Sequence, residues 1–189
     1  ADVEIAPGRS AVAMDKSGDG DEEGRERGLA IHRFLQLLTD GVKYDPAFVR
    51  QQVCIELNLD EKNRAPAEWQ TEAERLVKHP TFHNWFDATY YENAFNEIPV
   101  YYYSGNQLVH GVVDRLVVTA DSCFLIDYKT HHNATVEKLE TLASPYHEQL
   151  RLYKEGIKRL WPDNIVRAFL LFTACASAYE WQDKAQDRV

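Results

Sequence analysis

The apolar positions of the chain change their period along its length, and the changes mark the predicted elements. Between Arg27 and Thr39 the apolar residues recur at helical spacing, and Gly41 supplies a stop directly afterwards. Further helices are predicted over residues 45–59, 66–77 and 81–91. The N-terminal half of the chain is therefore expected to be helical.

Strand-like patterns follow in the middle of the chain. A run of aromatic and β-branched residues covers 95–103, and two further strands are predicted at 108–118 and 123–129. The pair Gly105–Asn106 is a favourable two-residue hairpin loop, and a turn centred there sets Glu97 opposite Asp114. A second turn, centred on Ala120–Asp121, sets Asp114 opposite Asp127.

The C-terminal part is predicted to contain one strong helix and one buried strand. Ser144 is the expected N-cap of the helix, with Pro145 at its first position, and the helix is expected to end at Trp161. A strand over 166–173 follows. The core-facing stripe of the helix is expected to be Tyr146, Leu150, Tyr153, Ile157 and Leu160. These elements predict an α/β fold in which helices flank a mixed sheet with an antiparallel meander.

The three aligned carboxylates need a compensating charge. Directly opposed residues of antiparallel strands lie about 5 Å apart on one face, where like charges are destabilising. Lys129 lies on the same face as Asp127 because side chains alternate along a strand. One lysine does not neutralise three carboxylates, whereas a divalent cation with oxygen ligands does. Any one of these acids alone is better interpreted as a solvated strand residue, but the aligned set predicts a metal site.

Ordered motifs around these acids resemble a known family. The sequence contains a G-x-x-D motif at Gly111–Asp114, then D-Y-K at Asp127–Lys129 and Q-x-x-x-Y at Gln149–Tyr153. Upstream it has G-x-x-x-H at Gly28–His32 and E-x-P at Glu97–Pro99. This set, spread over most of the chain, is similar to the nuclease domain of RecB and AddA helicase-nucleases, in the PD-(D/E)XK superfamily. Val113 departs from the proline of the superfamily name.

The resemblance implies a restriction-endonuclease-like core and a DNA nuclease, expected to be an exonuclease. Its metal ligands would be His32, Asp114, Asp127 and the backbone carbonyl of Tyr128. Lys129 would be catalytic, with a pKa lowered by the neighbouring cation. The expected cation is Mg²⁺ or Mn²⁺. Because imidazole suits Mn²⁺ better than Mg²⁺, strong activity with Mn²⁺ is expected. Glu97 is expected to have a supporting role.

The remaining motif residues also have plain structural interpretations. Gln149 and Tyr153 are four residues apart on one helical face, where they are expected to hydrogen-bond metal ligands or phosphate. Without the motif, Tyr153 would be a core residue and Gln149 a surface amide. His32, at the edge of an apolar stripe, would by itself be a packed core histidine. The two histidines at 131 and 132 receive no role.

The charge distribution bears on how DNA is held. The net charge is −9 over 189 residues, but residues 1–26 contain eight acidic and three basic residues. The remaining body is therefore only −4, with 22 acidic against 18 basic residues. We predict a flexible acidic segment at 1–26 and one nuclease domain at 27–189. Weak intrinsic DNA affinity is expected because phosphate contacts need Lys and Arg.

The acidic segment also contains a partial calcium motif. Five residues fit EF-hand loop positions, namely Asp15, Ser17, Asp19, Gly20 and Glu26. Glu22 stands where an aliphatic residue is needed, and the Ala6–Gly8 segment is a poor entering helix. We interpret the segment as a linker and keep a calcium-binding or protein-interaction module as an alternative.

Other features restrict the function class. The three cysteines are far apart and form no C-x-x-C motif, which fits a reducing cytoplasm, and no apolar run is long enough to span a bilayer. The absence of a P-loop motif indicates no motor in this chain, and Ala1 with a single methionine at 14 suggests an excised piece. The expected partners are DNA delivered by a helicase region of the same polypeptide and a second subunit. The alternative is a catalytically silent nuclease-like domain.

Overall fold

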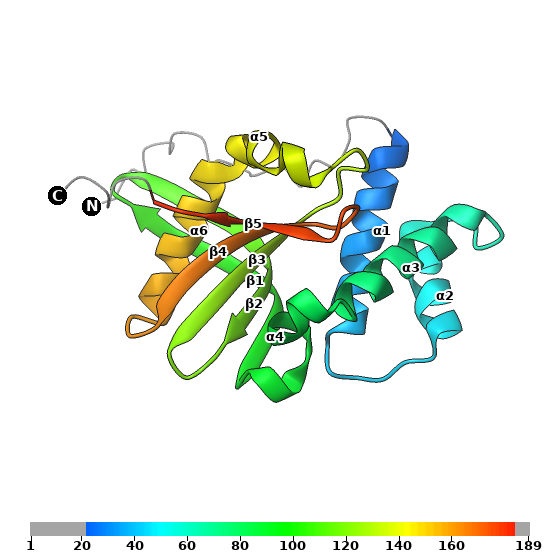
Figure 1. Ribbon diagram of the computed structural model, residues 1–189, viewed down its shortest axis with the longest axis horizontal. Coiled ribbons are helices and arrows are strands. Elements are labelled where there is room, and N and C mark those ends of the chain that lie inside the picture. The colour runs from blue at the N-terminus through cyan, green and yellow to red at the C-terminus, as the bar shows by residue number, and fades with distance from the viewer. Residues whose placement is uncertain (1–21, 184–189) are drawn as a thin grey trace, which may run out of the picture.

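A single mixed sheet organises the chain, and the computed structural model describes residues 22–183 of it. The sheet has five strands in the order β1-β2-β3-β4-β5. All neighbouring strands are antiparallel except β3 and β4, which are parallel. Helices α1 to α3 lie to one side of the sheet and α5 and α6 to the other (Figure 1). The predicted α/β fold with an antiparallel meander is confirmed.

The three N-terminal helices form where the apolar spacing predicts them. They are α1 (Glu22–Leu38), α2 (Pro46–Leu57) and α3 (Arg64–Val77). The side chain of Asp45 caps α2 by accepting hydrogen bonds from the backbone N–H groups of Ala47 and Phe48. Helix α1 starts within the acidic segment predicted for 1–26, and residues 1–21 lie outside the described residues.

The first three strands have the predicted register. They are β1 (Asn93–Ser104), β2 (Gln107–Val118) and β3 (Ser122–Lys129). Ser104 pairs with Gln107 across the first turn, and Asn96 pairs with Arg115 further along, as the Gly105–Asn106 loop requires. Across the second turn Arg115 pairs with Ile126, as a turn centred on Ala120–Asp121 requires. The turn chemistry therefore predicted both alignments correctly.

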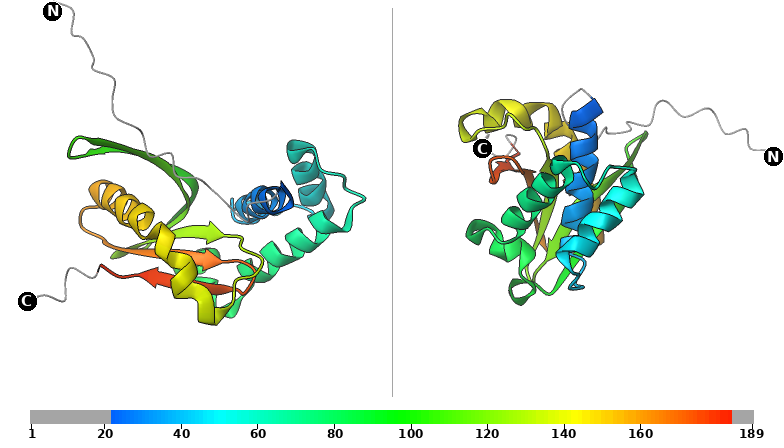
Figure 2. Two further views of the ribbon diagram at one scale, coloured as in Figure 1. Left: turned by 90° about the horizontal axis from the view of Figure 1, so that it is seen from above. Right: turned by 90° about the vertical axis from the view of Figure 1, so that its right-hand side faces the viewer.

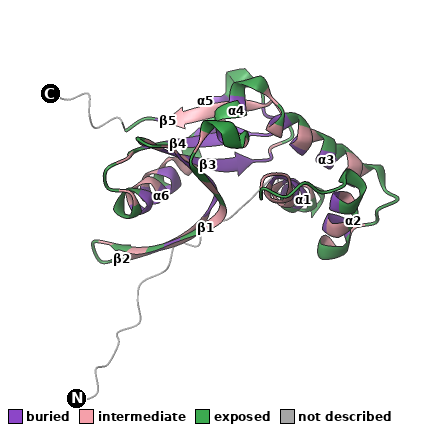
Figure 3. Ribbon diagram, turned by 90° about the horizontal axis from the view of Figure 1, so that it is seen from below, coloured by how far each residue is buried: buried purple, intermediate pink, exposed green. Residues whose placement is uncertain are grey.

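Two hydrophobic cores cover the two faces of the sheet. Strand β4 (Ile165–Phe172) is buried on both faces, so that Leu170 and Phe172 contact one core while Phe169 and Leu171 contact the other. The α6-side core includes Val113, Leu116, Leu125, Leu150 and Ile157. The α1-side core includes Ile31, Phe34, Leu35, Val117, Ile126 and Tyr128. Figure 3 shows the buried residues concentrated on the central strands and on the inner helix faces.

The long β1–β2 hairpin changes faces part way along. Val113 and Leu116, three residues apart on β2, both contact the α6-side core, although regular alternation would put them on opposite faces. On β1, Glu97 has a left-handed backbone with φ of 55°. This conformation costs a residue with a side chain about 1–2 kcal/mol. The hairpin bends, and its outer part curves over α6 (Figure 2, left). The bend lies at Glu97 and Asp114.

The aromatic stretch between α3 and β1 is not one helix as predicted. It forms three short turns, η1 (Pro80–Phe82), α4 (His83–Phe86) and η2 (Ala88–Tyr90). Asp87 interrupts the run because its backbone is extended and its side chain accepts the N–H of Thr89. The prediction of helical backbone at 81–91 was therefore right for short segments, and the prediction of one continuous helix was wrong.

The predicted cap of the last helix is wrong. Ser144 lies inside a helical run, made of η3 (Val136–Lys138), α5 (Leu139–Ala143), η4 (Ser144–Tyr146) and α6 (His147–Leu160). Because α5 already places the chain in the helical region, Ser144 enters with helical dihedrals and cannot act as an N-cap. Leu160, assigned to the core stripe, is 62% exposed at the end of α6. Strand β5 (Ser177–Trp181) was not predicted.

Gly111 is required by close packing against α6. A Cβ built at Gly111 would lie 2.2 Å from the Tyr153 Oη atom, and this hydroxyl accepts a hydrogen bond from the Val112 N–H at 3.3 Å. Tyr153 is only 1% exposed, so its ring has no free space to move into. The glycine of the G-x-x-D motif and the tyrosine of the Q-x-x-x-Y motif therefore form one packing unit.

We expect Gly111→Ala to lower the free energy of unfolding by about 1–3 kcal/mol, as overpacking does. Chemical denaturation measures the loss. Tyr153→Phe removes the nearest clashing atom, so the double variant is expected to lose less than the two single losses combined. Strict additivity of the two losses would contradict direct contact between these motifs.

Candidate metal centre

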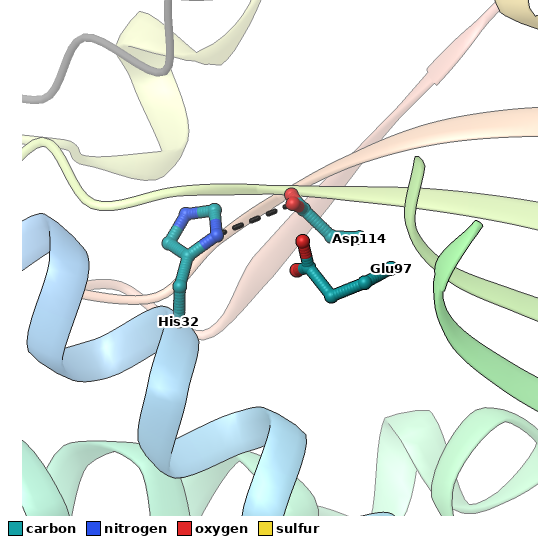
Figure 4. A group of neighbouring side chains, drawn as sticks. All are labelled: His32, Glu97 and Asp114. Atoms are coloured by element: carbon teal, nitrogen blue, oxygen red, sulfur yellow. Dashed lines mark ion pairs between the residues drawn. The ribbon is translucent and has the colours of Figure 1, made fainter. Parts of the chain in front are cut away.

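Three side chains from three different elements converge at the bend of the hairpin. His32 comes from α1, Glu97 from β1 and Asp114 from β2, and each offers a ligand atom within 4.8 Å of the others. The His32 Nδ1 atom lies 3.3 Å from Asp114 Oδ1. Figure 4 shows the imidazole and the two carboxylates pointing toward one another. One nitrogen and several carboxylate oxygens at this spacing form a donor set that fits a divalent cation.

Asp114 is held where the regular pairing of β2 with β3 stops. The paired residues of these strands end at Arg115 and Ile126, and beyond them the Tyr128 N–H donates to Asp114 Oδ2 at 2.7 Å. The carboxylate thus takes the place of a backbone acceptor. Asp114 is 3% exposed. A buried carboxylate needs such donors because burial alone disfavours its charge.

Helix α1 is fixed over this position by two contacts one turn before His32. Arg27 donates to the backbone carbonyl of Thr130 and forms a two-bond ion pair with Glu72 of α3, at 2.8 and 2.7 Å. A Cβ built at Gly28 would lie 3.1 Å from Thr130 Oγ1. The small residue at Gly28 therefore allows α1 to approach the end of β3, and this approach brings His32 to Asp114.

Asp127 and Lys129 form an ion pair at the end of β3, close enough to the cluster for Asp114 and His32 to interact electrostatically with the Asp127 carboxylate. The Lys129 Nζ atom lies 2.7 Å from Asp127 Oδ2 and 3.8 Å from the centre of the Tyr146 ring. The Gln149 amide donates to Asp127 Oδ1 at 3.5 Å, a long contact. Asp127 is 3% exposed and Lys129 is 5% exposed. Such a pair needs all of these contacts to offset the cost of desolvation.

The protonation of this pair follows from burial and proximity. Burial raises the pKa of Asp127, and the Lys129 ammonium partly offsets that rise. Burial by itself lowers the pKa of Lys129, but the attraction of the Asp127 carboxylate prevails and the net shift is upward. With the protein groups alone, Lys129 is therefore a cation. The lowered pKa expected from the sequence depends on a neighbouring metal ion.

The predicted site residues fall into two groups. Glu97, expected in a supporting role, stands in the metal-ligand cluster with His32 and Asp114. Asp127, expected as a ligand, contacts Lys129 and Gln149. A ligand role for Asp127 and for the Tyr128 carbonyl, and the catalytic role of Lys129, stay predictions. So do the roles of Gln149 and Tyr153. Four of the five EF-hand positions, from Asp15 to Gly20, lie outside the described residues, and the fifth, Glu26, lies in α1.

A buried arginine next to the cluster was not predicted to matter. Arg115 is fully buried, and its guanidinium donates to the Trp85 carbonyl at 2.8 Å and to Asn96 Oδ1 at 2.8 Å. Asn96 in turn donates to the Gln36 carbonyl at 3.2 Å. This network ties the C-terminal part of α1 to the strand residues beside Glu97 and Asp114. The only signal in the sequence was an arginine within a predicted strand.

The contact of Tyr146 with Lys129 was also missed. Its ring lies under the ammonium, and its hydroxyl is 3.1 Å from the His131 Nε2 atom. The sequence placed Tyr146 in the core stripe of the last helix, and it is only partly buried. A cation over an aromatic face gains about 0.5–2 kcal/mol. Tyr146 thus joins Asp127 and Gln149 in fixing the charged pair.

Comparison with known proteins gives a family and several relatives. Residues 10–187 match the family model described as the PD-(D/E)XK nuclease superfamily. A similar curated protein is the exonuclease/helicase subunit RexA of Lactococcus lactis subsp. cremoris, 26% identical over 77% of this chain and 12% of the relative. Another, from Lactiplantibacillus plantarum, is an ATP-dependent helicase/nuclease subunit, 34% identical over 35% of this chain and 5% of the relative. The chain thus spans a small part of these relatives.

The described part of the chain contains no helix that is long and apolar enough to cross a membrane.

We expect Mn²⁺ to stabilise the folded chain through this cluster. A cation present at about 100 times its dissociation constant stabilises a protein by about 2.7 kcal/mol. In a chain of this size that corresponds to a rise of about 5–10 °C in Tm. Asp114→Asn keeps an acceptor for the Tyr128 N–H but loses the ligand charge, so most of this rise should disappear. Calorimetric melting with Mn²⁺ and with a chelator measures it.

The matched control is Asp121→Asn, which changes an exposed turn carboxylate away from the cluster. It should retain the wild-type response to Mn²⁺. An Asp114→Asn variant with the full Mn²⁺-dependent rise would refute the assignment of this carboxylate.

Proposed function

Since this chain belongs to the PD-(D/E)XK nuclease superfamily, we propose that it hydrolyses DNA phosphodiester bonds with Mg²⁺ or Mn²⁺, as the nuclease domain of a helicase-nuclease. The observation that carries the proposal is the convergence of His32, Glu97 and Asp114 within 4.8 Å, at a bend reached by strands of the predicted register. Ile126 pairs with Arg115, the residue after Asp114, and the Asp127–Lys129 ion pair follows directly after Ile126.

His32, Glu97 and Asp114 would hold the cation, with Asp127 and the Tyr128 carbonyl as the further ligands that the resemblance implies. A bound dication lowers the pKa of a water molecule and neutralises charge on the phosphate. The one-nitrogen, many-oxygen donor set favours Mn²⁺ over Mg²⁺ at the histidine. The buried position of Asp114 excludes bulk water from one side of the cluster.

Lys129 supplies the positive charge of the proposed site and a proton that it can give up. Its ammonium donates to Asp127 and is held over the Tyr146 ring, so its position is fixed before substrate arrives. Protonated at Nζ, it would stabilise the extra negative charge of the pentavalent transition state. When a cation next to Asp127 weakens the attraction that raises its pKa, the same nitrogen would position or deprotonate the attacking water.

Gln149 and Tyr153 support this arrangement from α6. The Gln149 amide donates to Asp127, which orients the carboxylate toward the strand end. The Tyr153 hydroxyl accepts a hydrogen bond from the N–H of Val112, two residues before Asp114, and so fixes the position of β2 relative to α6. Both roles are positioning roles, and neither side chain needs to contact DNA.

We further propose that DNA reaches this domain from a helicase region, with a second subunit, in a cytoplasmic enzyme of recombinational repair. The names of the relatives support this placement, because they are helicase/nuclease subunits. Delivery of single strands by a motor also agrees with the modest basic content of residues 27–189. The alternative is a catalytically silent nuclease-like domain that binds DNA or a partner without cutting.

We expect Lys129→Met to lower cleavage of labelled single-stranded DNA by about 10²–10⁴-fold, the range of a general acid–base or charge-stabilising group. Lys154→Met, on the far side of α6 near Trp181, is the control and should cut at the wild-type rate. Melting curves in parallel exclude unfolding. Lys129→Arg keeps the charge but cannot lose its proton, which separates the two roles of the amine.

Linear and circular single-stranded DNA distinguish exonuclease from endonuclease action. An exonuclease degrades linear single strands and leaves a covalently closed circle intact. Cleavage of the circle would refute the exonuclease proposal, and wild-type protein that binds Mn²⁺ without cutting either substrate would favour the silent alternative.

A further inference from the structure

The hydroxyl of Tyr128 is buried without a hydrogen-bond partner. The Oη atom is shielded from solvent and no group in residues 22–183 bonds it, while the residue as a whole is 4% exposed. Leaving such a polar group buried and unpaired is costly, and phenylalanine would fill the same volume without that cost. An unpaired tyrosine hydroxyl in a core position therefore points to a partner outside residues 22–183.

The surroundings of this side chain are the metal-ligand cluster. The Tyr128 ring lies edge-on to the His32 imidazole, with 5.6 Å between the centres and 80° between the planes. Its own backbone N–H bonds the Asp114 carboxylate. The side chain thus stands beside His32, and its backbone stands beside Asp114.

The hydroxyl is a hydrogen-bond donor in this environment. A phenolic O–H donates to a nearby acceptor oxygen. The Arg115 guanidinium has no acceptor to offer, and it donates to the Trp85 carbonyl and Asn96. The missing partner must therefore supply an acceptor oxygen.

We propose that the Tyr128 hydroxyl donates a hydrogen bond to a water molecule held by the cation of the His32–Glu97–Asp114 cluster. The inference rests on the proposed metal-dependent function and adds a side-chain role to a residue for which only the backbone carbonyl was considered. Groups of this kind, bonded to the ligands of a metal rather than to the metal, typically change metal affinity 10- to 100-fold when removed.

Tyr128→Phe tests the proposal, because it removes only the hydroxyl. Without metal, in a chelator, the variant should melt at the wild-type temperature or about 2–4 °C higher, since an unpaired buried polar group is lost. Titration calorimetry with Mn²⁺ alone should show an affinity at least about tenfold weaker than that of the wild type. The combination of equal or higher stability and weaker metal binding is not produced by a merely structural role.

The matched control is Tyr102→Phe. The Tyr102 hydroxyl donates to the Leu152 carbonyl at 2.6 Å on the outer hairpin, away from the cluster. Its removal should lower the metal-free melting temperature by about 2–4 °C and leave Mn²⁺ affinity unchanged.

The outcomes distinguish the role of the Tyr128 hydroxyl from the existence of the metal site. Equal Mn²⁺ affinity of the wild type and Tyr128→Phe overturns the role of the hydroxyl and leaves the metal site standing. A metal-free melting temperature that falls in Tyr128→Phe as it does in Tyr102→Phe also overturns it, because the hydroxyl would then have a partner within the protein. A wild type that binds no Mn²⁺ refutes the metal site itself and the hydroxyl role with it.

Discussion

The structure depends on the compensation of buried negative charge at one end of its three-stranded meander. Asp114 and Asp127 are both almost fully shielded from solvent, and each obtains its donors differently. Asp114 accepts a backbone N–H of the next strand, beside the imidazole of α1. Asp127 accepts the ammonium of Lys129. Helices from both sides of the sheet reach this end, because His32 of α1 contacts Asp114 and Gln149 of α6 contacts Asp127.

The sequence predicted the register of the meander, which brings its acids to one end of the sheet. Turn residues determine which positions face one another, so Gly105–Asn106 sufficed to align Glu97 with Asp114. Side-chain direction was harder to predict, because alternation assumes a regular strand. The left-handed backbone at Glu97 and the change of face on β2 lie where Glu97, Asp114 and His32 meet, whereas Asp127 and Lys129 lie together as alternation along β3 predicts. No local pattern in the sequence indicates such a break.

The missed strand and the misplaced helix start each have a physical cause. Strand β5 is short, four of its five residues are only partly buried, and it forms by pairing with β4, which local propensity does not report. The misplaced start at Ser144 came from treating a serine–proline pair as a cap, although α5 already placed the chain in the helical region. The first error thus came from a tertiary contact and the second from the helical conformation of the preceding residues. The motif residues, by contrast, were found because packing constrains them in pairs, as Gly111 and Tyr153 show.

The bend in β1 also affects how this molecule meets others. β1 stands at the outer edge of the sheet, and twelve residues with many aromatic side chains would ordinarily offer a template for strands from neighbouring molecules. Pro99 has no N–H to offer, and two residues earlier the left-handed Glu97 turns the backbone out of line. The residue that brings a carboxylate to the cluster thus also interrupts a surface that would otherwise favour aggregation.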